Sequence, residues 1–220
     1  MANHFLVFIG GTGAKCAEAF VQLAAAGAVG DPSQTFHLLT LDVDATNGNR
    51  KLAIEAIERY SLLREQFPAT GPFQGSSLFG PEIRHYDWPV RLPDTFPHAA
   101  GANCLNAMRT QNSAEEEALM RLFYTDEELG FDFSREGFHA IPAIGAPVMQ
   151  YILSEGRDLG GFTDFADAMR SEVSAHSHLI VVGSIFGGTG ACGLPAVMRA
   201  LADQTRRIAL AGTLHAHAVL

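Results

Sequence analysis

A strand-like apolar run leads directly into glycines at residues 5–14, which read Phe-Leu-Val-Phe-Ile-Gly-Gly-Thr-Gly-Ala. Five consecutive apolar residues are typical of a parallel strand that is buried on both faces. Residues 14–26 place apolar side chains three and four positions apart, which predicts a helix. A second apolar run at 36–41 completes a strand–helix–strand unit, and such units cross over in the right-handed sense.

The glycine motif of residues 10–14 (the first glycine motif) recurs as Gly-Gly-Thr-Gly-Ala at residues 187–191 (the second glycine motif). The second copy follows an apolar run at 178–184 and precedes a helix predicted over 193–204. Glycines let the backbone approach an anion, and a helix N-terminus offers free N–H groups. We expect the two motifs to lie at the carboxyl ends of their strands and to hold one polyphosphate, with Thr12 and Thr189 each donating a hydroxyl hydrogen bond.

The rest of the chain alternates predicted strands and helices. A capping box at Ser113 opens one of the predicted helices, and the segment 138–153 is apolar but interrupted by prolines. The further expected elements are helices at about 50–66, 113–124 and 163–174, a strand near 83–88 inside an irregular excursion of about 67–112, and a strand beginning at 207–214. This order predicts an α/β fold with a mostly parallel sheet and helices on both faces, in one nucleotide-binding domain over residues 1–220.

The composition narrows the possible partners and the compartment. The 220 residues carry a net charge of −9 with 18% charged residues, a balance that disfavours general binding to nucleic acids or to anionic lipids. Three cysteines fit neither a disulfide framework nor metal-ligand spacing, which favours a reducing, cytoplasmic setting. The uncharged span 179–198 is long enough for a membrane helix, but its glycines favour strand, loop and helix instead. We expect neither a signal peptide nor a membrane partner.

Two other nucleotide-binding patterns compete for the first glycine motif. A P-loop needs Gly-Lys-Ser/Thr at its end, whereas Lys15 follows Ala14 and precedes Cys16. The dinucleotide fingerprint Gly-x-Gly-x-x-Gly fits from Gly11 but ends in Cys16, and Asp42 stands where a ribose-binding acid would lie. An NAD(P)-dependent Rossmann oxidoreductase therefore remains an alternative, although it leaves the second glycine motif unexplained.

Three stretches, residues 8–15, 41–45 and 183–190, together resemble the tubulin/FtsZ superfamily, and bacterial tubulin-like proteins most of all. The second glycine motif resembles the tubulin signature Gly-Gly-Gly-Thr-Gly-Ser-Gly, with Phe186 in place of the first glycine. The resemblance implies a cytoplasmic protein that binds GTP or GDP with Mg²⁺. It also implies nucleotide-dependent self-assembly into a homo-oligomer or filament.

The same resemblance implies which residues contact the nucleotide. They are Gly10, Gly11, Thr12, Gly13, Ala14, Lys15, Asp42, Asp44, Gly145, Ala146, Phe186, Gly187, Gly188, Thr189, Gly190 and Ala191. In this scheme the first motif holds the α- and β-phosphates, the second lies over the β- and γ-phosphates, and residues 139–147 take the place of a γ-phosphate-sensing loop. The two aspartates lie near the phosphates, the Mg²⁺ ion or the ribose, and Lys15 stands where FtsZ has a base-contacting asparagine.

No catalytic residue and no metal site are predicted within the chain. By resemblance, the acids that complete GTP hydrolysis belong to a domain that follows the fifth strand and act on a neighbouring subunit, so the implied GTPase activity has no catalytic acid here. A degenerate tubulin-like scaffold without nucleotide is a second alternative. Two His-x-His pairs, His176 with His178 and His215 with His217, each place two imidazoles on one strand face, but no third ligand is apparent in the sequence.

Overall fold

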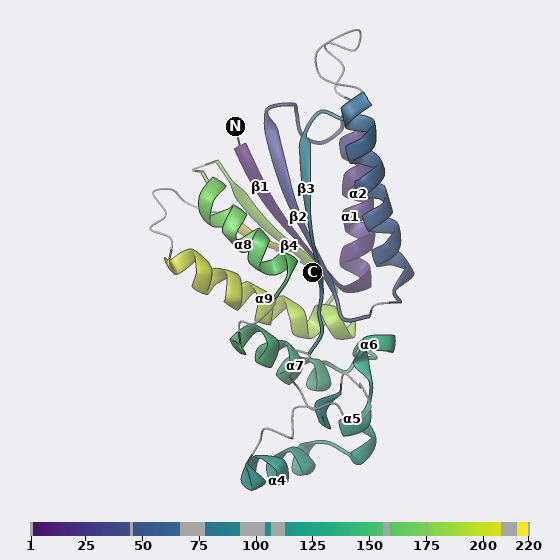
Figure 1. The fold of residues 1–220 in the computed structure, drawn as a ribbon, viewed down its shortest axis with the longest axis vertical. Coiled ribbons are helices and arrows are strands. Elements are labelled where there is room, and N and C mark those ends of the chain that lie inside the picture. The colour runs from purple at the N-terminus through teal and green to yellow at the C-terminus, as the bar shows by residue number, and fades with distance from the viewer. Residues whose placement is uncertain are drawn as a thin grey trace.

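The fold is an α/β sandwich around one five-stranded sheet, in the strand order β3-β2-β1-β4-β5 (Figure 1). The computed structural model describes residues 2–44, 46–66, 78–92, 104–106, 113–155, 159–174, 176–207 and 215–219. The strands are β1 (Ala2–Ile9), β2 (Gln34–Asp42), β3 (Glu82–Pro89), β4 (His178–Gly183) and β5 (His215–Val219). Every neighbouring pair is parallel, as in Rossmann-like folds.

Helices cover both faces of the sheet and also lie beyond the carboxyl ends of its strands (Figure 1). They are α1 (Gly10–Ala25), α2 (Gly48–Gln66), α4 (Ala114–Phe123), α5 (Asp126–Gly130), α6 (Phe133–Glu136), α7 (Pro142–Glu155), α8 (Gly161–Glu172) and α9 (Gly188–Arg207). α1 and α2 pack on one face, α8 and α9 on the other, and α7 packs against α9. The shorter helices α4, α5 and α6 lie below the sheet in the view of Figure 1.

Alternate residues of β1 enter two separate hydrophobic clusters. Phe5, Val7 and Ile9 face the α8–α9 side, whereas Leu6 and Phe8 face α1 and α2. All five are buried, so neither face of the strand is left for polar residues. This two-sided burial is the reason that the strand reads as a continuous apolar run.

Most of the predicted elements are confirmed, but two helices begin about one turn earlier than expected. The predictions at 36–41, near 83–88 and at 178–184 correspond to β2, β3 and β4, and the helix at 50–66 corresponds to α2. However, α1 begins at Gly10 rather than residue 14, and α9 begins at Gly188 rather than residue 193. The glycine motifs therefore form first helical turns rather than separate loops. Close packing outweighs the low helix propensity of glycine here, since a Cβ at Gly190 would lie 2.2 Å from the backbone oxygen of Ser184.

Prolines do not interrupt the helix in the segment 138–153, which contains α7. Pro142 is the first residue of α7, a position that suits proline because its missing N–H has no helical partner, and Pro147 lies inside the same helix. The strand expected to begin at 207–214 is found at 215–219 instead: Arg207 still belongs to α9, and 208–214 lie outside the described residues.

Within the irregular excursion predicted at about 67–112, β3 is present. Residues 67–77, 93–103 and 107–112 of that excursion are not among those described. In the described part of the chain, no helix combines the length and the apolar character needed to cross a membrane.

Candidate functional site

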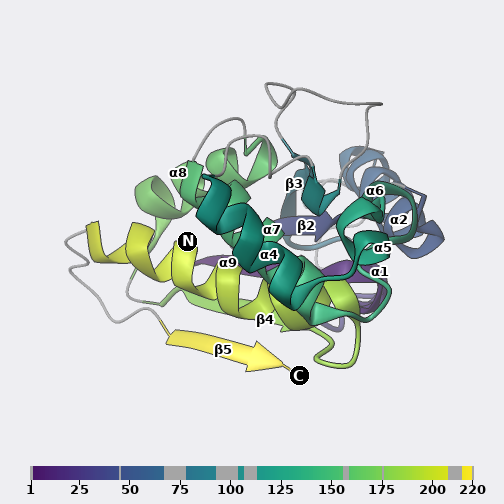
Figure 2. The same cartoon turned by 90° about the horizontal axis from the view of Figure 1, so that it is seen from below.

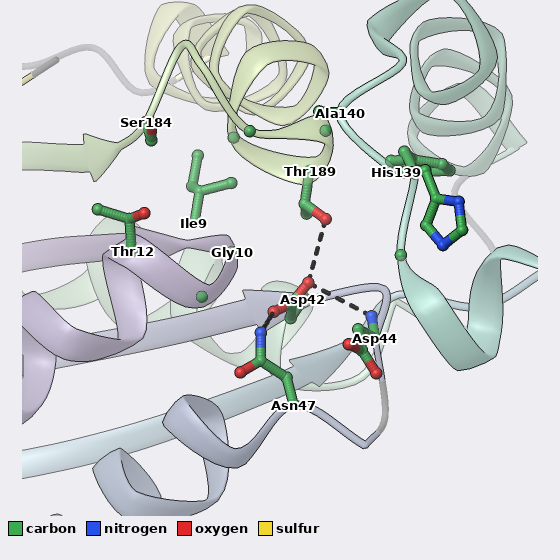
Figure 3. Close-up of a pocket in the computed structure, with 16 residues that line it drawn as sticks. Ile9, Gly10, Thr12, Asp42, Asp44, Asn47, His139, Ala140, Ser184 and Thr189 are labelled. Atoms are coloured by element: carbon green, nitrogen blue, oxygen red, sulfur yellow. Dashed lines mark hydrogen bonds between the residues drawn. The ribbon is translucent and has the colours of Figure 1, made fainter.

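Both glycine motifs lie at the point where the strand order of the sheet reverses. β1 is the central strand, with β2 on one side and β4 on the other, and both β1 and β4 end immediately before or close to a glycine motif. In open parallel sheets, the crevice at such a reversal is where ligands bind. The structure therefore brings the two motifs, 177 positions apart in the chain, to one edge of the sheet (Figure 3).

A cavity of about 210 Å³ lies between the two motifs. Its lining comes from the ends of β1, β2 and β4, the first turns of α1 and α9, and a turn that precedes α7 (Figure 3). The lining residues are Ile9, Gly10, Gly11, Thr12, Asp42, Asp44, Asn47, Gly137, Phe138, His139, Ala140, Ser184, Gly187, Gly188, Thr189 and Gly190.

The N-terminus of α1 lines the cavity, and no side chain caps it. Ile9 is the extended N-cap residue and provides no side-chain hydrogen bond, and Gly10 reaches the helix with a φ of +71°. By contrast, Ser113 and Thr125 cap α4 and α5, which lie away from the cavity, each through a reciprocal bond with a glutamate. The first N–H groups of a helix have no partner within the helix, so those of α1 are available to an anion.

A four-residue turn, 184–187, connects β4 to α9 and contains Gly187, the first residue of the second motif. The hydroxyl of Ser184 accepts a hydrogen bond of 3.2 Å from the backbone N–H of Phe186. A Cβ added at Gly187 would meet no atom within 4 Å, whereas one at Gly188 would lie 2.8 Å from the Cβ of Phe138. Gly187 thus borders open space, whereas the segment that contains Phe138 packs against the motif at Gly188.

Asp42 is the buried centre of a hydrogen-bond network at the end of β2, and only 3% of its surface is exposed. Its Oδ1 accepts from the hydroxyl of Thr189 at 3.1 Å and from the N–H of Asp44 at 3.3 Å. Its Oδ2 accepts from the amide of Asn47 at 2.8 Å. Burial raises the pKa of Asp42, although these three hydrogen bonds oppose the shift. The hydroxyl of Thr189, expected to face a ligand, instead joins the second motif to β2.

Asn47 connects this network to the first motif. Its amide donates to Asp42, and its side-chain oxygen accepts from the N–H of Asn49 at 2.9 Å. A Cβ at Gly11 would lie 2.7 Å from the Asn47 amide nitrogen. The absence of a side chain at Gly11 therefore lets Asn47 pack against α1 while it holds the carboxylate of Asp42.

The ionisable side chains among the described lining residues are Asp42, Asp44 and His139. Asp44 is half-buried, and one of its oxygens accepts from both the N–H and the hydroxyl of Thr46 at 2.8 Å. Two carboxylates would repel a bare polyphosphate. They suit one that carries Mg²⁺, because that ion is usually held by one or two carboxylates together with substrate phosphates.

The turn at residues 137–141 closes one side of the cavity in an unusual backbone conformation. His139 and Ala140 have φ values of 45° and 56°, and Gly137 has a φ of 66°. Each non-glycine residue in this region costs about 1–3 kcal/mol, and such strain is often found at functional sites. A Cβ at Gly137 would lie 3.8 Å from the hydroxyl of Thr189, so the turn packs directly over the Asp42 network.

The cavity gathers nine of the sixteen residues that the sequence analysis proposed. They are Gly10, Gly11, Thr12, Asp42, Asp44, Gly187, Gly188, Thr189 and Gly190. The seven that do not line it are Gly13, Ala14, Lys15, Gly145, Ala146, Phe186 and Ala191.

Packing explains the position of several of these seven. Gly13 and Ala14 are buried inside the first turns of α1, and Lys15 is exposed. Gly145 lies in α7, where a Cβ would be only 2.5 Å from the sulfur of Cys192 on α9. It therefore permits the close approach of two helices.

Seven lining residues were not among the sixteen proposed, although two of them, His139 and Ala140, begin the segment 139–147 that the resemblance sets in place of a γ-phosphate-sensing loop. These are Ile9, Asn47, Gly137, Phe138, His139, Ala140 and Ser184. Asn47 follows the Asp-x-Asp pair closely and was the one most open to prediction, since an amide next to such a pair is a common ligand or carboxylate partner.

Comparison of the chain with protein-family models, with curated proteins and with solved structures gave no match.

Proposed function

We propose that the protein binds a nucleoside polyphosphate, GTP or GDP, with Mg²⁺ in the cavity between α1 and α9. One observation carries the proposal: two identical glycine motifs, each at the start of a helix, line one cavity together with Asp42 and Asp44. Two helix N-termini supply partial positive charge and N–H donors for phosphates. The cavity volume of about 210 Å³ is below the roughly 300–1,000 Å³ typical of whole ligand pockets, which suits the phosphate part of a nucleotide.

The residues present fit a phosphate-bound Mg²⁺ ion. The half-buried Asp44 would supply a carboxylate oxygen, Asp42 would lie behind it, and the phosphates would complete the coordination. When bound, the ion would neutralise the phosphates next to the two acids. The chain's own contribution is the N–H groups of α1, the open position at Gly187 and the hydrogen bonds that fix the Asp42 carboxylate.

The hydrogen bonds that Asp42 already accepts within the protein favour this proposal over a dinucleotide-binding oxidoreductase. In that alternative, the acid at the end of the second strand accepts hydrogen bonds from a ribose. Here both oxygens of Asp42 already accept bonds from Thr189 and Asn47, and the side chain is buried.

We also propose that the domain is of the tubulin/FtsZ type and assembles in a nucleotide-dependent way. The resemblance rests on three stretches, and residues from each of them, at the first glycine motif, at Asp42–Asp44 and at the second glycine motif, line the same cavity. Sedimentation in the presence of GTP, GDP or no nucleotide tests assembly. A sedimenting fraction that is the same in all three conditions would remove the assembly part of the proposal and leave binding open.

Calorimetric titration with GTP, GDP, ATP and NAD⁺, each with and without Mg²⁺, tests binding directly. We expect GTP and GDP to bind and Mg²⁺ to strengthen GTP binding. Binding of NAD⁺ alone would favour the oxidoreductase alternative. If no nucleotide binds to the folded chain, the better interpretation is a degenerate scaffold.

Gly187→Val gives the sharpest test of the site, with Gly48→Val as its matched control. A Cβ at either glycine meets no atom within 4 Å, so both variants should fold, but Gly187 lines the cavity and Gly48 begins α2 outside it. We expect Gly187→Val to weaken GTP binding roughly tenfold or more, about 1.4 kcal/mol, and Gly48→Val to leave it unchanged. Equal affinities for both variants and the parent would place the nucleotide elsewhere.

A further inference from the structure

A second cluster of polar side chains lies between the first turn of α2 and the strands β2 and β3. The guanidinium of Arg50 forms an ion pair with Oδ2 of Asp87, and Oδ1 of Asp87 accepts a hydrogen bond of 3.1 Å from the hydroxyl of Thr40. That hydroxyl is also 2.8 Å from Nε2 of His85. These four residues form the Arg50 cluster, and none of the four lines the cavity.

The hydrogen bonds of the Arg50 cluster assign its charges. The one proton of the Thr40 hydroxyl goes to the carboxylate of Asp87, so the hydroxyl oxygen accepts from His85, which carries a proton on Nε2. Burial lowers the pKa of His85, which favours its neutral form. Only 15% of the Arg50 side chain is exposed. Arg50 is therefore the cation that balances the charge of Asp87 in this largely buried cluster.

Two segments connect the Arg50 cluster to the cavity. Arg50 lies in the first turn of α2, and Asn47, immediately before that helix, holds Oδ2 of Asp42. β3 is the edge strand opposite β5, and α2 packs against it (Figure 2). Three residues after Asp87, the N–H of Val90 donates to the carbonyl oxygen of Asp42 at 3.0 Å. The ion pair therefore joins α2 to β3 close to the points where both elements reach Asp42.

The segment just before α2 also carries the proposed Mg²⁺ ligand. The N–H of Asn47 donates to the carbonyl oxygen of Asp44 at 3.4 Å. The N–H of Asp44 donates to Oδ1 of Asp42 at 3.3 Å. Because Asn47 contacts both aspartates and leads directly into the helix, a movement of the first turn of α2 would move both carboxylates.

We propose that Arg50 is a positioning residue for the nucleotide site: its ion pair with Asp87 keeps the start of α2 in place, so that Asp44 can reach a phosphate-bound Mg²⁺ ion. The inference rests on the proposed function, since it concerns the same site. Replacing a buried ion pair with apolar residues of similar volume often costs no stability, so a role in fixing geometry accounts better for its presence. Residues that orient metal ligands commonly change metal affinity by roughly 10–100-fold.

The competing explanation is that the ion pair only attaches α2 to the sheet. In that case its loss lowers the free energy of unfolding and leaves the nucleotide affinity of the folded chain unchanged. A positioning role instead affects the part of the GTP affinity that Mg²⁺ supplies. Binding without Mg²⁺, through the N–H groups of α1, then stays nearly the same. Comparing GTP affinity with and without Mg²⁺ separates the two explanations.

The test is calorimetric titration with GTP, in Mg²⁺ and in EDTA, of Arg50→Gln, Asp87→Asn and Arg50→Lys. We expect the first two to lower GTP affinity roughly tenfold or more in Mg²⁺ and less than about twofold in EDTA. Arg50→Lys keeps the positive charge and should retain most of the affinity. Arg59→Gln is the matched control, because Arg59 lies on the same helix, is 75% exposed and pairs with Glu55. It should bind like the parent.

Failure of the proposed function would show in the parent, whereas failure of the positioning role would show in the variants. If the parent binds no GTP in Mg²⁺, both proposals fail. If it does bind, unchanged Mg²⁺–GTP affinity in folded Arg50→Gln and Asp87→Asn overturns the positioning role alone, as does an equal loss in Mg²⁺ and in EDTA. Thermal unfolding shows which variants are folded. If Arg50→Gln is not, Asp87→Asn decides, because asparagine retains an oxygen for the bond from Thr40.

Discussion

The two glycine motifs have the same five residues and yet differ in structure. β1 passes into α1 without a turn, and Gly10, the first glycine of its motif, bends the chain with a positive φ. β4 reaches α9 through a four-residue turn, and the equivalent Gly187 lies in that turn with open space beside it. The threonines differ as well: Thr12 is exposed at the cavity, whereas Thr189 is buried and bonded to Asp42.

This difference shows that the residues before a motif decide which of its glycines must adopt a positive φ and which permit close packing. In the first motif, the strand ends one residue before the helix, so the backbone itself has to turn at Gly10. In the second motif the preceding turn absorbs the change in direction, and the glycines are free to serve close packing. We therefore expect equivalent substitutions in the two motifs to have unequal effects.

The largest effect is expected where a Cβ would strike backbone. Gly190→Ala would place the new methyl 2.2 Å from the oxygen of Ser184, and Gly13→Ala would place it 2.7 Å from the carbonyl carbon of Phe8. Neither backbone group can move without disturbing a strand end. We expect losses in the free energy of unfolding of about 3 kcal/mol at Gly190 and about 2 kcal/mol at Gly13, measured by urea denaturation. A loss below about 0.5 kcal/mol at both positions would mean that the first turns relax easily.

The next effect contrasts the first glycines of the two motifs. Gly10→Ala forces a non-glycine residue into a φ of +71° and places its Cβ 3.3 Å from that of Thr189, so we expect a loss of about 2 kcal/mol. Gly187→Ala meets neither a positive φ nor a nearby atom, and we expect a change within about 0.5 kcal/mol. Similar losses at both positions, again by urea denaturation, would contradict the difference between the motifs.

A smaller effect separates the two threonines. Thr189→Val removes the hydroxyl that donates to the buried Asp42 Oδ1, and we expect a loss of about 1 kcal/mol in the free energy of unfolding. Thr12→Val changes an exposed side chain and should stay within about 0.5 kcal/mol. If Thr12→Val weakens GTP binding while Thr189→Val mainly lowers stability, the two threonines have separate roles. A larger loss of stability at Thr12 would reverse that assignment.

The sequence was sufficient to predict the sheet and much of the site, because both depend on local patterns. Continuous apolar runs predicted β1, β2 and β4, and the carboxyl ends of parallel strands necessarily share an edge. That reasoning placed Asp42 at the edge of the sheet where the motifs lie, the resemblance placed it near the phosphates, and Asp42 lines the same cavity as both motifs.

What the sequence could not provide were contacts between distant segments. Thr189 and Asp42 are 147 positions apart, and no periodicity indicates that they bond. The strained turn at 137–141 likewise lacks a local signal, since His139 and Ala140 are not residues that favour a positive φ as glycine does. Gly145 was expected to contact the nucleotide, whereas it lets α7 approach Cys192 of α9.

The smallest effect concerns the pH dependence of stability, which Asp42 should alter. Burial raises its pKa in the folded chain above the ordinary value of 3.8, so the folded state takes up a proton at a higher pH than the unfolded state does. Asp42 therefore adds stability below pH 3.8 that is lost as the pH rises through the raised pKa.

Relative to Asp42→Asn, the parent should gain free energy of unfolding as the pH falls from 7 toward 4. Denaturation series for both proteins at several pH values measure this difference. Taking the difference cancels the titration of groups that the two proteins share. The opposite slope would mean that the bonds from Thr189, Asp44 and Asn47 outweigh burial, and the network around the second motif would then hold an ionised carboxylate at little cost.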